Sequence, residues 1–125
     1  SNEAALKFTE TCQIHAESYS SAEVLHGPVA IVDGGFPVIA LASHDKAEAA
    51  LAEVADTLAD KGTQVFGTSN MLTKATQLPV VRTGYPLTDP IALIASFYAM
   101  VEQTATAWGI NPDAPRHLKK VTETV

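Results

Sequence analysis

The sequence predicts an α/β layer fold with a parallel sheet, and three observations support this. Short apolar runs lack polar alternation, amphipathic helix-like segments lie between and after them, and 46% of the 125 residues are hydrophobic. Strands without alternation are typical of parallel sheets covered on both faces, and helices between strands are typical of their connections. A chain of this length is one domain or part of one.

Two helices are expected before the first strand. Apolar residues recur at helical spacing from about residue 3 to residue 19, which predicts the first helix. Ser20-Ser21 can start a second, short helix, and Gly27-Pro28 ends it. The chain is therefore expected to enter its first strand from helical structure.

Three strands are expected. The apolar run Phe36–Ala42, bounded by glycines and a serine, predicts a strand that is buried on both faces. A second strand is expected over residues 63–68 and a third over residues 78–83, where Pro79 places the start of the strand at an edge of the sheet.

The helix between the first two strands is expected to begin with a capping box. Asp45 would be its N-cap and Glu48 its third residue, and Gly62 would end it. Its buried face is expected to comprise Ala47, Leu51, Val54 and Leu58.

The longest helix is expected to start at Asp89-Pro90, with Asp89 as its cap, and to end at Gly109. Its predicted apolar face is Ile91, Ile94, Ala95, Tyr98, Val101, Ala105 and Trp108. The two prolines of residues 111–115 predict an extended segment, and a last helical turn is expected over residues 116–121.

Composition and charge narrow the possible partners and compartment. The net charge of −6 offers no basic face to a nucleic acid or an anionic membrane, so neither partner is expected.

Cys12 is the only cysteine, which excludes an internal disulfide and favours a reducing, cytoplasmic location. No run approaches the roughly 20 apolar residues of a membrane span. The chain opens without a signal-peptide pattern. Because it also lacks an initiator Met, we expect it to be part of a longer protein.

Other constellations predict little. The four histidines have no zinc-like spacing, and one cysteine cannot complete a thiolate site, so no metal or cofactor is expected. Ser43-His44-Asp45 is consecutive and cannot form a catalytic triad, so we interpret it as a loop and helix cap. Gly34-Gly35 predicts a turn, not a nucleotide-binding loop.

Two local motifs and one residue pair are more specific. Lys7 and Glu10 lie one helical turn apart, His26-Gly27-Pro28 presents a histidine in a tight turn, and the chain closes with the segment Pro115-Arg116-His117-Leu118-Lys119-Lys120. Together these residues resemble the C-terminal sugar isomerase (SIS) domain of glucosamine-6-phosphate synthase-like enzymes and of isomerizing glucosamine-6-phosphate deaminases.

This resemblance spans residues 4–125 and is most specific at the two ends. It implies a three-layer α/β/α, flavodoxin-like SIS domain with a parallel sheet. SIS domains place a strand and a Gly-rich loop directly before the helix with which this chain begins. We therefore expect a single, partial, C-terminal SIS domain over residues 1–125 that lacks its first strand, leaving an open sheet edge.

The resemblance also implies roles for individual residues. Moving a carbonyl between adjacent sugar carbons requires a base that shuttles a proton, a group that opens the ring, and stabilisation of the intermediate. Glu10 would shuttle the proton, His26 would open the ring from the neighbouring subunit, and Lys120 would form an imine with the ketose. Lys7 would lie near the substrate hydroxyls or Glu10, and Glu23 would orient the His26 turn.

The implied function is isomerization and deamination of a hexosamine 6-phosphate, glucosamine 6-phosphate giving fructose 6-phosphate and ammonia. The family's Ser/Thr-rich phosphate loop is absent here and belongs to a preceding N-terminal SIS domain. That domain and a second copy of the protein are therefore expected partners, and the isolated chain is expected to be inactive. Alternatives are the isomerase domain of a glutamine-dependent synthase, a fructosamine deglycase, a non-catalytic phosphosugar-binding regulator, and a flavodoxin-like domain of another role.

Overall fold

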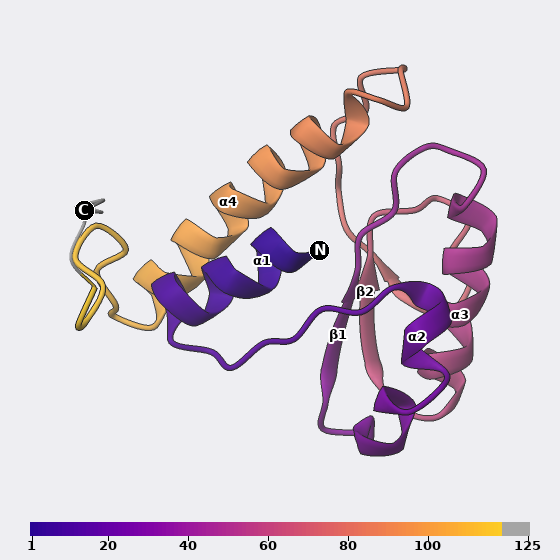
Figure 1. The fold of residues 1–125 in the computed structure, drawn as a ribbon, viewed down its shortest axis with the longest axis horizontal. Coiled ribbons are helices and arrows are strands. Elements are labelled where there is room, and N and C mark those ends of the chain that lie inside the picture. Colours follow the sequence, from indigo (N-terminus) through magenta and orange to yellow (C-terminus); the bar gives the residue numbers. More distant parts are fainter. Residues whose placement is uncertain (119–125) are drawn as a thin grey trace, which may run out of the picture. The chain divides into compact units, whose positions relative to one another are not determined.

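The computed structural model describes residues 1–118, and these form two compact units (Figure 1). One unit contains Tyr19–Ser96. The other contains Asn2–Ser18 together with the chain from Phe97 onward, so the longest helix contributes to both units.

The first unit is built on a parallel sheet of three strands, as predicted. The strands β1 (Pro37–Ala40), β2 (Gln64–Gly67) and β3 (Thr76–Gln77) lie in the order β1-β2-β3. Val38 pairs with Val65, and Gly67 pairs with Gln77. The α/β fold class is therefore confirmed.

The third strand lies earlier than predicted, and the prediction for residues 78–83 was wrong. The Leu78 N–H donates to Gly67 O at 2.7 Å, but the chain leaves the sheet immediately afterwards. Pro79 has no N–H to donate to a ladder, so the strand cannot continue through it. Residues 78–83 instead form an irregular segment.

The first strand is less buried than predicted. Val38, Ile39 and Ala40 are only half-buried, and Pro37 is exposed. In the described part of the chain β1 pairs with β2 alone, so one edge of the strand has no ladder. This position explains why the apolar run is not covered on both faces.

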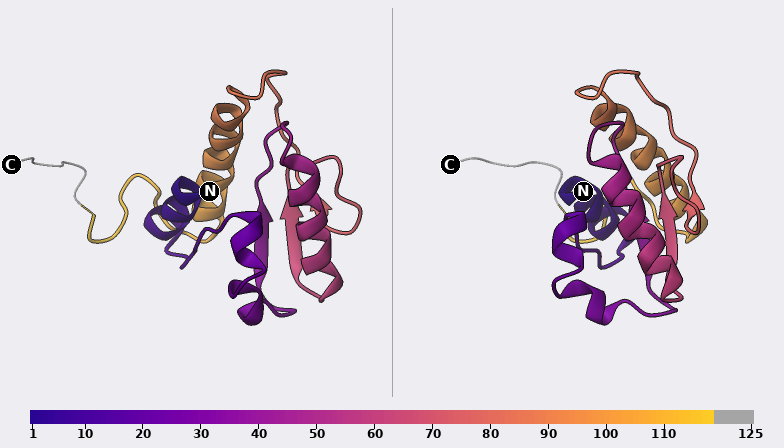
Figure 2. Two further views of the ribbon diagram at one scale, coloured as in Figure 1. Left: turned by 45° about the vertical axis from the view of Figure 1, so that its right-hand side comes forward. Right: turned by 90° about the vertical axis from the view of Figure 1, so that its right-hand side faces the viewer.

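The helix α3 (Glu48–Asp60) packs against β1 and β2, and the short helix α2 (Ser21–Val24) lies beside it (Figures 1 and 2). The buried face of α3 is Glu48, Ala52, Ala55 and Leu58, so only Leu58 of the predicted stripe is fully buried. Gly62, at φ +88°, follows its C-terminus as expected. The core cluster is Ala55, Leu58 and Val65, surrounded by Val24, Val29, Val32, Val38, Ala40, Val54, Ala59, Leu72 and Ala75.

The predicted capping box of α3 is wrong. Ala47 occupies the N-cap, and the Asp45 carboxylate accepts a bond only from the Ala47 N–H at 2.8 Å. The Glu48 side chain does not reach back to the cap; it is 4% exposed and bonds to residues far away in sequence. The Glu48 carboxylate therefore makes tertiary contacts and takes no part in a local capping motif.

The second predicted helix is confirmed as α2 (Ser21–Val24). Ser20 and Glu23 form a capping box: the Glu23 N–H donates to Ser20 Oγ at 3.2 Å, and the Ser20 N–H donates to the Glu23 carboxylate at 2.9 Å. A 3-10 helix, η2 (Pro28–Ile31), follows and leads toward β1.

The second unit begins with α1 (Asn2–Lys7), which continues as a π-helical segment, η1 (Phe8–Cys12). The prediction that this helix reaches residue 19 was wrong. The carbonyl of Phe8 accepts from the N–H groups of both Gln13 and Ile14, and Gln13 adopts a left-handed φ of 58°. These contacts close the helix end, and residues 13–20 are irregular.

Apolar contacts hold η1 to the C-terminal half of the longest helix, α4 (Asp89–Ala107). The rings of Phe8 and Phe97 meet edge to face, with centroids 5.0 Å apart. Cys12 is 1% exposed, and its Sγ lies 3.4 Å from Val101 O.

Cys12 should react slowly with a thiol reagent in the native protein. Burial raises the pKa of its thiol, which disfavours the reactive thiolate. We expect labelling by Ellman's reagent to be at least about 100-fold slower than in the unfolded chain. Because the chain has one cysteine, the labelled fraction is a direct readout. Equal rates in native and denaturing buffer would contradict the burial of Cys12.

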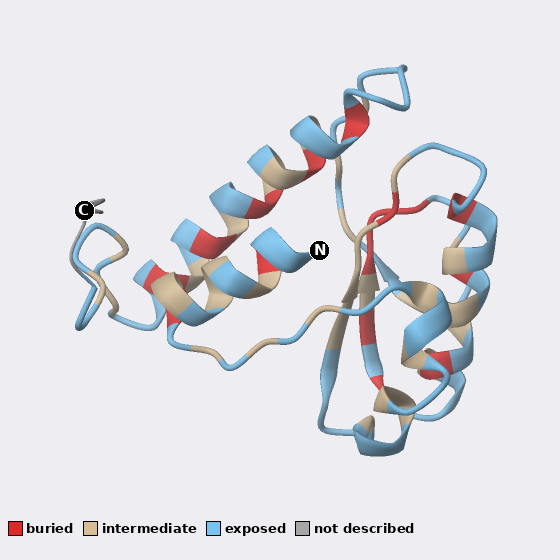
Figure 3. Cartoon of the chain, viewed as in Figure 1, coloured by how far each residue is buried: buried red, intermediate tan, exposed pale blue. Residues whose placement is uncertain are grey.

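The start of α4 at Asp89 and its end before Gly109, at φ +72°, are as predicted. Its buried face is different. Leu93, Phe97, Val101 and Ala105, spaced four apart, are buried (Figure 3). Ile91 and Trp108 are 67% and 63% exposed. The face of α4 that packs against other groups is narrower than the set of apolar residues on the helix, so some of these residues remain exposed.

The segment after α4 is a turn and not the predicted extended chain. The Asp113 N–H donates to Asn111 Oδ1 at 2.9 Å, which is an Asx turn. A further turn holds Arg116 and His117. Residues 119–121 of the last predicted helical turn lie outside the described residues. Of the helices in residues 1–118, none is long and apolar enough to cross a membrane.

Candidate functional site

Two of the predicted site residues, Lys7 and Glu10, are in direct contact. Lys7 lies at the end of α1 and Glu10 in η1, and Lys7 Nζ donates to Glu10 Oε2 at 2.8 Å. Their side chains are 33% and 29% exposed, so the pair is partly shielded from water but open on one side. The helical spacing that suggested this pair predicts the contact correctly.

Further contacts hold Lys7 in its charged form. The hydrogen bond from Lys7 to Glu10 raises the pKa of the lysine, and Glu3 lies 3.8 Å away on the preceding turn. Tyr98, on α4, donates to Glu3 at 2.6 Å, and this bond raises the pKa of the phenol. At neutral pH Lys7 is therefore an ammonium donor rather than a nucleophile.

Glu23 and His26 lie in one turn, but their side chains do not meet. The Glu23 carboxylate belongs to the capping box, and its bond from the Ser20 N–H lowers the pKa of the acid. The Glu23 carbonyl accepts from the His26 N–H at 3.0 Å, so Glu23 holds the turn through its backbone. The His26 ring is exposed, and Gly27, at φ 177°, has an extended φ that other residues also adopt. Lys120 lies outside the described residues.

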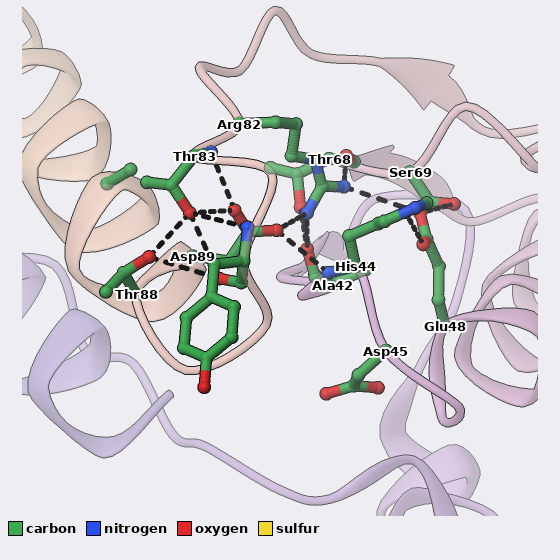
Figure 4. Close-up of polar contacts among 12 residues, drawn as sticks. Ala42, His44, Asp45, Glu48, Thr68, Ser69, Arg82, Thr83, Thr88 and Asp89 are labelled. Atoms are coloured by element: carbon green, nitrogen blue, oxygen red, sulfur yellow. Dashed lines mark hydrogen bonds and ion pairs between the residues drawn. The ribbon is translucent and has the colours of Figure 1, made fainter.

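A second polar constellation, which the sequence did not reveal, lies at the carboxyl ends of the strands (Figure 4). We call it the carboxyl-edge network; it comprises His44, Glu48, Ser69, Arg82, Thr83 and Asp89. His44, Glu48 and Asp89 were expected only in a loop and in helix caps. A further signal that could have indicated the network is Arg82, a lone cation after the apolar run of residues 78–81.

Arg82 is the centre of this network and joins the segments that follow the strands. Nη1 donates to Ala42 O at 2.8 Å and to Asp89 Oδ2 at 3.2 Å. Nη2 donates to Thr68 O at 2.6 Å and to Glu48 Oε1 at 3.4 Å. The guanidinium thus satisfies two carbonyls and two carboxylates from four segments, which only its planar array of donors can do.

Glu48 connects Arg82 to a histidine and a serine. Ser69 Oγ donates to Glu48 Oε1 at 2.8 Å, and the other carboxylate oxygen lies 2.8 Å from His44 Nδ1. Because this carboxylate already accepts from Arg82 and Ser69, the contact with His44 is satisfied when Nδ1 carries the proton. His44 itself is largely exposed, with 69% of its side chain accessible.

Asp89 is fully buried and does not cap α4 with its side chain, contrary to the prediction. Its carboxylate accepts from the Thr83 N–H and hydroxyl, both at 2.8 Å, and from the His44 N–H at 3.0 Å. These bonds, those from Thr83 foremost, hold the pKa of Asp89 well below its usual range. Asp89 therefore fixes the backbone that carries His44.

Beside this network lies a pocket of about 400 Å³. Its lining residues come from the segments after all three strands: His44, Glu48, Thr68, Asn70, Gln77, Val80, Arg82 and Gly84. The carboxyl ends of parallel strands are where α/β proteins generally bind ligands. Within residues 1–118 no group of three His, Cys, Asp or Glu side chains is placed to hold a metal ion.

Asp56, on α3, holds the loop between β2 and β3 that carries Asn70. Its carboxylate accepts from the N–H groups of Thr73, Lys74 and Ala75 at 2.9, 3.0 and 3.1 Å. It also accepts from the Thr73 hydroxyl, and this bond is the largest cause of an Asp56 pKa well below its usual range.

Replacing Asp56 with asparagine should lower the melting temperature by a few degrees at pH 7. A depressed pKa in the folded state stabilises the protein above the unfolded pKa of about 4, and this contribution declines as the pH falls toward the folded value. The difference between wild type and Asp56→Asn should therefore shrink below about pH 4. Asp113→Asn, at an exposed position, is the control. A difference that does not vary with pH would contradict this role.

Comparisons with known proteins agree with the fold. No family model matches the chain. The chain is 33% identical over 124 residues to the isomerizing glutamine–fructose-6-phosphate aminotransferase of Agrobacterium fabrum, a match that covers 94% of this chain and 20% of that enzyme. It is 34% identical over 123 residues to the Aeropyrum pernix enzyme of the same name, with the same coverage. The chain thus spans about a fifth of the length of these relatives.

Solved structures give a similar result. A proposed phosphosugar isomerase from Silicibacter pomeroyi has a TM-score of 0.86 and 64% identity, covering 90% of this chain and 35% of that one. Glucosamine-6-phosphate deaminase from Thermotoga maritima has a TM-score of 0.67 and 26% identity, covering 96% and 35%. The C-terminal domain of the Francisella tularensis aminotransferase has a TM-score of 0.79, covering 89% and 33%; at 23% identity it shows the fold alone.

The parallel sheet and these matches define the class: an α/β fold of the sugar isomerase (SIS) type, related to phosphosugar isomerases. More particularly, the chain is similar in sequence to isomerizing glutamine–fructose-6-phosphate aminotransferases. Its fold matches the C-terminal domain of one such enzyme. The resemblance identified in the sequence is confirmed.

Proposed function

We propose that this chain is part of an enzyme that isomerizes a hexosamine 6-phosphate, with Glu10 as the proton-transfer base. The observation that supports it most directly is the Lys7–Glu10 contact of 2.8 Å on a partly open surface. In the deaminating direction, glucosamine 6-phosphate and one water give fructose 6-phosphate and ammonia.

The proton transfer suits the surroundings of Glu10. Aldose–ketose isomerization moves a proton from C2 to C1, which requires a base that can reach both carbons, and a carboxylate suits this role. The neighbouring Lys7 ammonium donates to the Glu10 carboxylate at 2.8 Å and has further N–H groups for a substrate hydroxyl. In this proposal Lys7 binds and orients, while Glu10 acts on carbon.

The remaining roles follow the resemblance. His26, exposed at the end of the α2 turn, would open the sugar ring, and Glu23 would hold that turn through its carbonyl bond to the His26 N–H. Lys120 would form the imine with the ketose. The phosphate anchor would come from a preceding SIS domain, and a second subunit would receive His26, so a homodimer in the cytoplasm is part of the proposal.

A second candidate is the isomerase domain of a glutamine-dependent synthase. The names of the relatives support it, because they are isomerizing aminotransferases that use glutamine and fructose 6-phosphate. The same C1–C2 proton transfer would serve both reactions, so the two candidates differ in the source and direction of the nitrogen.

The test uses the complete gene product that contains this sequence. It is incubated with glucosamine 6-phosphate without glutamine, and fructose 6-phosphate and ammonia are measured. Release of both products in equal amounts supports the deaminase. Turnover that occurs only when fructose 6-phosphate and glutamine are both supplied supports the synthase. Tight phosphosugar binding with no turnover in either assay would overturn both and indicate a regulator.

A further inference from the structure

The pocket beside the carboxyl-edge network has the position and size of a small-molecule site. It has a volume of about 400 Å³, within the range of about 300–1,000 Å³ that is usual for such sites. His44 follows β1, Asn70 follows β2 and Gln77 ends β3, so the ends of all three strands contribute. All of these residues belong to the Tyr19–Ser96 unit, and the inference does not depend on Glu10.

The cation beside this pocket is not free to bind a phosphate. The four contacts of the two Arg82 Nη atoms go to Ala42 O, Thr68 O and the carboxylates of Glu48 and Asp89. An anion would have to displace one of these carboxylates and would lie close to both. Arg82 is therefore a structural tie between segments, and the pocket offers no unpaired cation among its lining residues.

His44 presents an oriented ring nitrogen, Nε2. Its backbone N–H is bonded to buried Asp89 at 3.0 Å, and its Nδ1 lies 2.8 Å from buried Glu48. With the proton on Nδ1 directed at Glu48, Nε2 is the ring nitrogen that remains to bond to a ligand hydroxyl. A carboxylate that holds a histidine in one tautomer is the usual means of setting which nitrogen meets a ligand.

Two side-chain amides in the lining have unused hydrogen-bonding capacity. Asn70 and Gln77 are exposed, and their amide groups bond to no other residue within positions 1–118. Each offers two N–H donors and one carbonyl acceptor. Donors and acceptors without net charge suit a ligand with several hydroxyl groups, each of which both donates and accepts.

We propose that this pocket binds a neutral, hydroxyl-rich ligand of the size of one sugar ring, with His44 Nε2 bonding to one hydroxyl and the amides of Asn70 and Gln77 bonding to others. The expected ligand differs from a sugar phosphate because it has no anionic group. Recognition in this pocket requires hydroxyl groups and does not require a negative charge.

Saturation-transfer NMR on the complete gene product tests this, with N-acetylglucosamine as the neutral probe. We expect transfer to the sugar, at least about tenfold weaker binding in the double variant Asn70→Ala/Gln77→Ala, and unchanged binding in Gln103→Ala, an exposed glutamine on α4. Because the side chains of Asn70 and Gln77 are exposed and make no hydrogen bond within residues 1–118, the double variant should keep the wild-type melting temperature.

Inorganic phosphate is the competitor. It should leave the sugar signal unchanged, and displacement by phosphate alone would overturn the proposal in favour of an anion site. Equal saturation transfer to the sugar from wild type and from the double variant would show that the sugar binds elsewhere. This result would also overturn the proposal. Loss of turnover in the assay of the proposed function has no bearing on this result, since none of the varied residues belongs to the Lys7–Glu10 pair.

Discussion

Replacing Glu10 with glutamine should reduce the turnover of glucosamine 6-phosphate by about 10²- to 10⁴-fold, the usual contribution of a positioned general base. The substitution keeps the size of the side chain and an oxygen that can accept from Lys7 Nζ, so the helix should be preserved. What it removes is the carboxylate that takes the proton from C2. The measurement is steady-state kinetics on the complete gene product.

The control is Glu53→Gln, which removes an exposed carboxylate from α3. It should leave both kcat and KM unchanged. Because Lys7 is assigned to binding and orientation, Lys7→Met should raise KM as well as lower kcat, whereas Glu10→Gln should act mainly on kcat. Loss of less than about tenfold in kcat for Glu10→Gln would contradict its role as the base.

Replacing Arg82 with methionine should lower the free energy of unfolding by about 3 kcal/mol, the lower end of the range for removing one partner of a buried ion pair. Glu48, 4% exposed, and the fully buried Asp89 would each lose a cation, and the carbonyls of Ala42 and Thr68 would lose a donor. The lower end applies because 25% of the Arg82 side chain is exposed to solvent.

Urea denaturation measures this change, and Arg116→Met is the matched control. The chain has two arginines, and Arg116 is exposed, so its replacement changes the net charge equally without disturbing a buried contact. Arg82→Lys should recover only part of the loss, since one ammonium cannot serve four oxygens on separate segments. Equal midpoints for Arg82→Met and Arg116→Met would show that the network contributes little to stability.

The local features of the fold were predictable from the sequence. The start of a short helix at Ser20-Ser21, the glycine that ends α3 and the start of α4 at Asp89-Pro90 each depend on residues within one or two helical turns. The Lys7–Glu10 contact is of the same kind, because helical spacing alone brings those side chains together.

Features that depend on distant packing were not predictable in this way. Glu48 has the spacing of a capping-box residue, but it bonds to Ser69 and Arg82, which are 21 and 34 positions away. Asp89 has the position of a cap, but it accepts from the His44 N–H, 45 positions earlier. The same limit explains the error on α4, where Ile91 and Trp108 were expected to be buried and are exposed.

By itself, the sequence therefore determined the order of helices and strands, the parallel α/β class, the family relationship and the Lys7–Glu10 pair. The tertiary structure alone decided which residues meet at the carboxyl ends of the strands. The physical reason is that backbone hydrogen bonding and helical periodicity act over a few residues, whereas a buried charge is placed by whichever donors the fold brings to it. The carboxyl-edge network and its pocket are accordingly properties of the fold and not of any local motif.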